Sequence, residues 1–174
     1  KAAAERVRES QVSTMLAEVA AVTGSPIDDL SIEALEAHGR SSLQPMLERA
    51  VAYLKARKAL KDAETATQLG ALRGRLGAVK ARVVTLKAER RRVECEGMVA
   101  RVRAMLDVSL DGMGESQCRQ HESECRSLRG EAASYLRARK ALHGEAASAV
   151  SMLGGRATEA KQAASDRVEE QRQR

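Results

Sequence analysis

Cys118, His121 and Cys125 are spaced C-x2-H-x3-C, which places two thiols and one imidazole on the same face of a helix. Thiolates and imidazoles are typical zinc ligands, and a structural zinc site uses four of them. Only three lie together here, so Cys95 would have to supply the fourth. Cysteine also occurs as an ordinary buried residue. We therefore interpret the three residues as one core face of a helix, and we predict no metal and no cofactor.

The three cysteines of the chain bear on its cellular compartment. An odd and low number suits a reducing environment better than a disulfide framework. In a hairpin that turns near residue 110, Cys95 would lie opposite Cys125, and these two thiols could form a disulfide. The alternatives are therefore an intracellular protein with free thiols and a cell-surface protein with this disulfide.

No residues are spaced as in a known catalytic site. His38, His121 and His143 have no serine or carboxylate partners that form a triad pattern, and no phosphate-binding loop or dinucleotide fingerprint occurs. We therefore expect no enzymatic activity.

The segment from residue 73 to residue 92 contains eight basic residues and one acid, Glu89. With Leu69 at heptad position a, three of the cations fall at position e and two at position g, which flank a helical seam and select the partner helix by charge. The predicted partner-binding residues are Arg73, Arg75, Lys80, Arg82, Lys87, Arg90, Arg91 and Arg92.

Several partners could neutralise this basic segment. One is internal, the acidic stretch that contains Asp28, Asp29, Glu33 and Glu36. Another is an acidic protein surface or partner helix, and homo-oligomerisation also remains open. Nucleic acid is disfavoured, because binders that tolerate any sequence stack bases on aromatic side chains, and this chain has two tyrosines, no Phe and no Trp.

One octapeptide occurs twice, as YLKARKAL from Tyr53 and as YLRARKAL from Tyr135, 82 residues later. Tyr53, Arg57, Tyr135 and Arg139 all fall on 3-4 ladders of core-type positions. We interpret each copy as one coiled-coil unit within a long helix, in which the arginine sets the register of pairing. A duplicated binding motif is the alternative.

The sequence predicts that the chain that positions these residues is all-helical. It is rich in Ala, Leu and charged residues, which is typical of coiled coils. The segmentation is two short helices over 1–40, a first long helix over 41–110, and a turn with a second long helix over 111–174. We expect Ser25 and Pro26 to start the second short helix, and Gly39 to end it.

These elements predict an elongated antiparallel helical hairpin, coiled-coil-like, with the turn at the SLDGMG sequence near residue 110. A three-helix or four-helix bundle is the alternative fold. A break of the first long helix between Gly70 and Gly77 would give a short four- or five-helix bundle.

The expected function is that of a non-enzymatic scaffold that binds other proteins through its basic helical face, associated with the cytoskeleton or microtubules. No apolar run is long enough to predict a membrane span. The alternative is an extracellular helical surface protein with a Cys95–Cys125 disulfide. In overall composition the chain resembles the Ala-rich surface antigens and receptors of trypanosomes, and that resemblance implies a cell-surface location.

Overall fold

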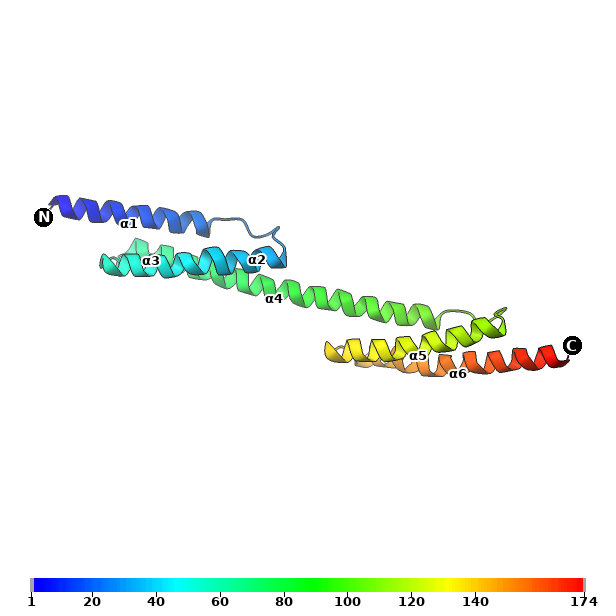
Figure 1. Ribbon diagram of the computed structural model, residues 1–174. Helices are drawn as coiled ribbons and strands as arrows, with labels where there is room; N and C mark the ends of the chain where they lie inside the picture. The colour runs from blue at the N-terminus through cyan, green and yellow to red at the C-terminus, as the bar shows by residue number, and fades with distance from the viewer. Residues whose placement is uncertain (1, 174) are drawn as a thin grey trace. The chain divides into compact units, whose positions relative to one another are not determined.

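The computed structural model describes residues 2–173, and all regular structure in this range is helical, which confirms the all-α class (Figure 1). The elements are α1 (Ala2–Thr23), α2 (Ile32–His38), the π-helix η1 (Gly39–Leu43), α3 (Gln44–Ala56), α4 (Ala63–Leu106), α5 (Glu115–Ala138) and α6 (Gly144–Gln173).

The contacts divide the chain into two compact units, of which one ends at Ala88 and the other begins at Glu89. We call them the N-terminal and the C-terminal unit. Helix α4 contributes residues to both. The sequence predicted divisions after residues 40 and 110, so the observed boundary lies inside the expected first long helix.

The N-terminal unit contains three helical segments: α1, the uninterrupted run α2–η1–α3, and α4 up to Ala88. Apolar residues at helical spacing give each segment one buried face, as with Met15, Leu16 and Val19 in α1. The core that these faces form consists of Met15, Leu16, Val19, Ile27, Leu35, Leu43, Ala50, Leu54, Ala59, Leu69, Leu72, Leu76, Val79 and Val83.

The C-terminal unit contains α4 from Glu89, together with α5 and α6, which pack side by side (Figure 1). Its core uses smaller side chains, with several alanines on α6. The buried residues that form it are Met98, Val102, Cys125, Leu128, Ala132, Leu136, Ala149, Val150, Leu153 and Ala157.

The expected first long helix is interrupted, because α3 ends at Ala56 and α4 begins at Ala63. The chain turns at Lys58, which adopts a left-handed conformation with φ 53°. The amide of Ala59 donates to the carbonyl of Leu54 at 3.0 Å, and that of Lys58 to the carbonyl of Lys55 at 3.0 Å. This is the hydrogen-bond pattern of a Schellman turn, which ends a helix.

The expected second long helix is interrupted in the same way. Lys140 has φ 55°. The amide of Ala141 donates to the carbonyl of Leu136 at 2.8 Å, and that of Lys140 to the carbonyl of Arg137 at 3.0 Å. The octapeptide therefore encodes a helix end and a turn, and its interpretation as a continuous coiled-coil unit was wrong. The usual signal for such a turn, a glycine in the left-handed position, is replaced here by lysine.

Two further boundaries differ from the sequence-based expectation. Residues 24–31 form a loop, and the second helix starts after Ser31, whose hydroxyl accepts from the amide of Ala34 at 3.1 Å. Helix α2 ends at His38 with Gly39 as its C-cap, as expected, but the helical run continues because Gly39 also opens the π-helix. Helix α4 passes through Gly70 and Gly77 without a break, so the alternative interruption does not occur there.

The predicted turn near residue 110 is present. Helix α4 ends at Leu106 and α5 begins at Glu115. Gly112 takes a left-handed φ of 74° in the loop between them, which fits its expected role as a turn former.

The two units follow one plan, which is a helix, a loop of eight residues, a second helical segment, a short turn and a third helix. In the first helices, Met15 corresponds to Met98 and Val19 to Val102, 83 positions later. The octapeptides lie 82 positions apart. In the third helices, the separation is 81 positions, as between Leu72 and Leu153.

The sequence separation between corresponding positions of the two units falls by one residue at two places. The first is the π-helix Gly39–Leu43, whose wider turn accommodates one extra residue in the N-terminal unit. The second is the turn that begins within the octapeptide and spans 57–62 in the N-terminal unit and 139–143 in the C-terminal unit. The structure therefore shows a duplicated three-helix unit with two single-residue length differences.

The left-handed lysines lead to a stability prediction. Replacing Lys58 with glycine should raise the free energy of unfolding by about 0.5 to 1 kcal/mol, because glycine adopts positive φ without the steric cost of a Cβ atom. The matched control is Lys55→Gly, within α3, which should lower it by about 1 kcal/mol. Urea denaturation measures both, and a Lys58→Gly variant as destabilised as Lys55→Gly would contradict this account of the turn.

Candidate functional site

The repeated tyrosine and arginine form a stacked pair at the end of the second helical segment in each unit. The guanidinium carbon of Arg57 lies 3.4 Å from the ring centroid of Tyr53, and that of Arg139 lies 3.6 Å from the ring centroid of Tyr135. Each arginine also donates to the carbonyl of its own tyrosine, at 3.3 and 3.4 Å. We call each arrangement a Tyr–Arg cap.

Each Tyr–Arg cap is tied to the first helix of its own unit. Arg57 donates through Nε to Oε1 of Gln11 at 3.0 Å. In the C-terminal unit the corresponding acceptor is Glu94, whose Oε2 lies 3.8 Å from Nε of Arg139 and accepts from the hydroxyl of Tyr135 at 3.4 Å. The arginines lie half-buried at helix ends, where they connect two helices.

A second arginine recurs on the third helix of each unit. Arg75 donates to the carbonyl of Ser25, and Arg156 donates to the carbonyl of Val108. Both carbonyls belong to the loop between the first and second helices. Each arginine therefore fixes that loop against the third helix. Arg75, one of the predicted partner-binding residues, makes this contact within the N-terminal unit.

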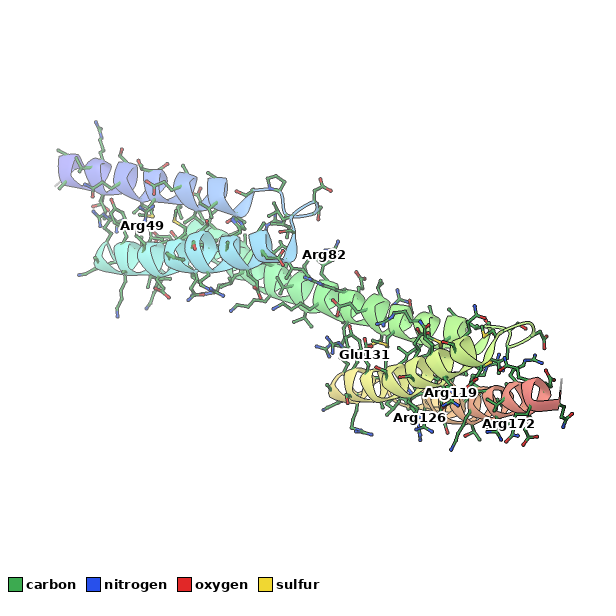
Figure 2. All side chains as sticks on the ribbon, turned by 45° about the vertical axis from the view of Figure 1, so that its right-hand side comes forward. Arg49, Arg82, Arg119, Arg126, Glu131 and Arg172 are labelled. Atoms are coloured by element: carbon green, nitrogen blue, oxygen red, sulfur yellow. The ribbon has the colours of Figure 1, made fainter. Side chains whose placement is uncertain are left out.

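An ion pair recurs with its charges exchanged. In the N-terminal unit Glu18 of α1 pairs with Arg49 of α3, and in the C-terminal unit Arg101 of α4 pairs with Glu131 of α5 at 2.8 Å (Figure 2). The hydrogen bond from Arg101 lowers the pKa of Glu131 below its ordinary value, and Glu131 raises the pKa of Arg101 in turn.

The structure separates the eight predicted partner-binding residues into two groups. Lys87 pairs with Glu36 at 2.6 Å, Arg90 pairs with Glu94, Arg92 lies 3.9 Å from Glu96, and Arg75 holds the loop carbonyl. The other four are exposed and form no ion pair with the residues that the structure describes. These four, which we call the exposed cations, are Arg73, Lys80, Arg82 and Arg91.

The two edges of the α4 seam face different neighbours within the N-terminal unit. The edge with Lys80 and Lys87 borders α2, as the ion pair with Glu36 shows. The edge with Arg75 borders the loop after α1, and Arg82 is exposed on the same edge (Figure 2). Glu36 is one of the four acids proposed to neutralise this segment internally.

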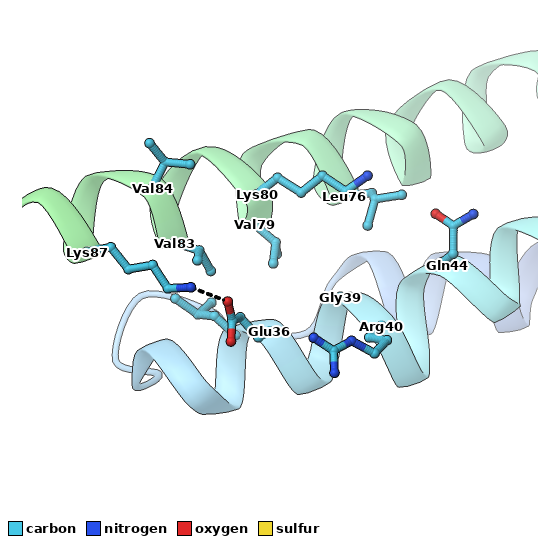
Figure 3. Close-up of a pocket in the computed structure, with 11 residues that line it drawn as sticks. Glu36, Gly39, Arg40, Gln44, Leu76, Val79, Lys80, Val83, Val84 and Lys87 are labelled. Carbon is cyan, nitrogen blue, oxygen red and sulfur yellow. Dashed lines mark hydrogen bonds and ion pairs between the residues drawn. The ribbon is translucent and has the colours of Figure 1, made fainter.

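A groove of about 680 Å³ runs between the second helical segment of the N-terminal unit and α4 (Figure 3). Its base is apolar, and its rim carries cations with one carboxylate, Glu36. The lining residues are Leu35, Glu36, Gly39, Arg40, Gln44, Leu76, Val79, Lys80, Val83, Val84 and Lys87.

Cys118, His121 and Cys125 lie on the inward face of α5, where all three are buried. The Sγ atom of Cys125 is 3.5 Å from Nε2 of His121. All three cysteines are free thiols, and Cys95 is half-buried. Within residues 2–173 no group of three or more His, Cys, Asp or Glu side chains is arranged to hold a metal ion. The helical spacing thus placed these residues in the core of the C-terminal unit.

Burial shifts the pKa of two of these residues, His121 and Cys125. It lowers the pKa of His121, with a further lowering from the nearby charge of Arg156 and a smaller opposing effect from Glu124. Burial also raises the pKa of the Cys125 thiol. Both groups therefore favour their neutral forms.

Comparison with known proteins gives no further assignment, since no protein-family model, curated protein or solved structure matches the chain. Over the described residues, no helix combines the length and the hydropathy needed to cross a bilayer.

The sequence analysis did not predict two features of the site. The exchange of Glu18–Arg49 for Arg101–Glu131 could have been found by aligning the chain with itself, because the partners are 83 and 82 positions apart. The role of Arg75 could not, since it depends on where the loop carbonyl of Ser25 lies in space.

The Tyr–Arg cap gives a prediction opposite to that of a register-setting core arginine. Arg139→Leu should lower the free energy of unfolding by about 1 to 2 kcal/mol, because it removes the stack on Tyr135 and the contact with Glu94. The matched control is Arg137→Leu on the exposed side of α5, which should change it by no more than about 0.5 kcal/mol. Thermal melts that show stabilisation by Arg139→Leu would contradict the Tyr–Arg cap and favour a register-setting core arginine.

The lowered pKa of His121 predicts a pH-dependent stability. The unfolded chain binds a proton near the ordinary value of 6.5, whereas the folded chain resists protonation until the pH is lower, so stability is lost as the pH falls below 6.5. His121→Leu should flatten this part of the melting temperature profile, and His143→Leu, at an exposed position, should retain it. Identical slopes for wild type and His121→Leu would show that His121 does not contribute.

Proposed function

We propose that this chain is a non-enzymatic scaffold module that binds an acidic protein surface through the exposed cations of α4. The observation that carries the proposal is the incomplete neutralisation of α4 in the N-terminal unit. Arg73, Lys80 and Arg82 extend into solvent and have no ion-pair partner among the described residues, whereas Arg75 and Lys87 on the same helix are engaged.

The duplicated unit supports a scaffold role. Each unit has its own core and its own set of interhelical contacts, so repeated units can supply surface area without a deep catalytic pocket. Scaffolds associated with the cytoskeleton meet strongly acidic protein surfaces, and the net charge of +6 favours association with such partners. An intracellular location also fits the three free thiols.

A charge-reversal experiment tests the proposal. The variant Arg73→Glu, Lys80→Glu, Arg82→Glu should bind poly-glutamate at least about tenfold more weakly than wild type in 0.15 M salt, because the cations that meet the polymer are inverted. Added salt should reduce the difference in affinity between wild type and variant, since the Debye screening length falls to about 3 Å at 1 M salt. Fluorescence anisotropy with labelled poly-glutamate measures both.

The matched control inverts three exposed cations elsewhere in the N-terminal unit, Arg6, Lys55 and Lys61, and therefore has the same net charge. It should retain most of the affinity. Equal loss in both variants would mean that net charge alone attracts the polymer, and unchanged binding in the α4 variant would refute the proposed surface. Circular dichroism should show similar helical content for both variants.

A further inference from the structure

We propose that the groove between α2–η1 and α4 is the docking site for an amphipathic, acidic helix of a partner protein. This inference rests on the proposed function and narrows its partner from any acidic surface to a helix with one apolar face. The groove lies within the N-terminal unit, and two of the predicted partner-binding residues, Lys80 and Lys87, line it.

The apolar base of the groove argues for a partner that brings apolar side chains. Leu76, Val79 and Val83 contribute the base, and Val84 is 68% exposed beside them. Gly39 adds no side chain there, and a Cβ atom at that position would lie 3.4 Å from Cγ1 of Val79. The helices therefore come close together, so Leu76, Val79 and Val83 at the junction are only 8%, 1% and 9% exposed, and Val84 presents the larger apolar surface beside them. An extended acidic tail alone would leave this surface unused.

The rim supplies the charge complementarity. Arg40 lies on the side of η1 and Lys80 on the side of α4, both exposed and without an ion pair to any described residue, while Lys87 bridges to Glu36 (Figure 3). Cations on both sides of an apolar base match a helix whose apolar stripe is flanked by carboxylates on both sides. Helices that bind in grooves present such a stripe at positions i, i+3, i+4 and i+7.

The duplication provides an internal comparison. In the C-terminal unit the stretch of α5 that corresponds to the start of the π-helix contains His121, a buried side chain 4% exposed. The π-helix at Gly39–Leu43 also belongs to the N-terminal unit alone among the described residues. The groove therefore coincides with the place where the N-terminal unit departs from the shared plan, and such π-helical insertions are frequent at functional sites.

The test uses a defined probe, a labelled alanine-based peptide of about 20 residues, long enough to form a helix. It carries leucine at i, i+3, i+4 and i+7 with glutamate on both flanks. A second peptide has the same composition in an order that gives no apolar face. By fluorescence anisotropy with the full chain, the patterned peptide should bind at least about tenfold more tightly than the scrambled one.

Two variants locate the binding. Arg40→Glu with Lys80→Glu should weaken the patterned peptide about tenfold or more, whereas Lys55→Glu with Lys61→Glu, which changes the net charge equally, should have little effect. Val84→Gln should weaken it roughly threefold to tenfold, and Val7→Gln, at a valine 57% exposed in α1, should not. Because Arg40, Lys80 and Val84 are all exposed, these changes do not remove core contacts.

The outcomes separate this inference from the proposed function. Equal binding of both peptides, or binding unaffected by Val84→Gln, would overturn the groove as the docking site. The proposed function, binding of an acidic protein surface, would still stand. Self-association of the chain that is abolished by Val84→Gln, without peptide binding, would assign the groove to a second copy and overturn the inference. No binding of either peptide up to about 1 mM would overturn both proposals.

Discussion

Both units depend on the point at which their second helical segment stops. The hydrogen bonds from Ala59 to Leu54 and from Ala141 to Leu136 end the helix, and the left-handed lysines reverse the chain so that the third helix can pack against the first two. Lysine in this conformation costs about 1 to 2 kcal/mol, and this cost is offset by the turn's hydrogen bonds and by the complete burial of Leu54 and Leu136. The Tyr–Arg cap then ties this helix end to the first helix.

Small side chains make the third helix necessary. The chain has no Phe and no Trp, and several core positions of α6 are alanine, including Ala149, Ala157 and Ala160. A pair of helices with such faces buries little apolar surface, and burial stabilises in proportion to the area removed from water. A third helix removes further apolar area from water in each unit. Arg75 and Arg156 add a contact that closes the loop opposite the Tyr–Arg cap.

The sequence predicted the faces of the helices better than their ends. Ladders such as Leu69, Leu72 and Leu76 placed the core correctly, and Gly112 marked a turn that the structure contains. The ends at Ala56 and Ala138 were missed, because neither glycine nor proline marks them and the heptad ladder continues through both. Gly70 and Gly77 suggested a break that does not occur, since both lie on the exposed side of α4, where glycine costs stability without preventing a helix.

The candidate site could be predicted only in part for a similar reason. Heptad positions e and g correctly placed Lys80 and Arg82 beside the seam. They could not show that Arg75 holds the carbonyl of Ser25 or that Lys87 meets Glu36, because both contacts depend on how a separate segment folds back. The groove depends on the π-helix, and a π-helix has no simple sequence signal comparable to an N-cap or a glycine C-cap.

The exchanged ion pair has a consequence for folding. Two similar units on one chain carry the risk that the first helix of one packs against the second helix of the other, a common misassembly of repeat proteins. In that arrangement Glu18 would meet Glu131, and Arg101 would meet Arg49, so both contacts would bring like charges together. The correct pairings bring opposite charges together in both units. Because both positions of the pair reverse sign between the units, each unit has its own charge pattern, which opposes mispairing between helices of the N-terminal unit and helices of the C-terminal unit.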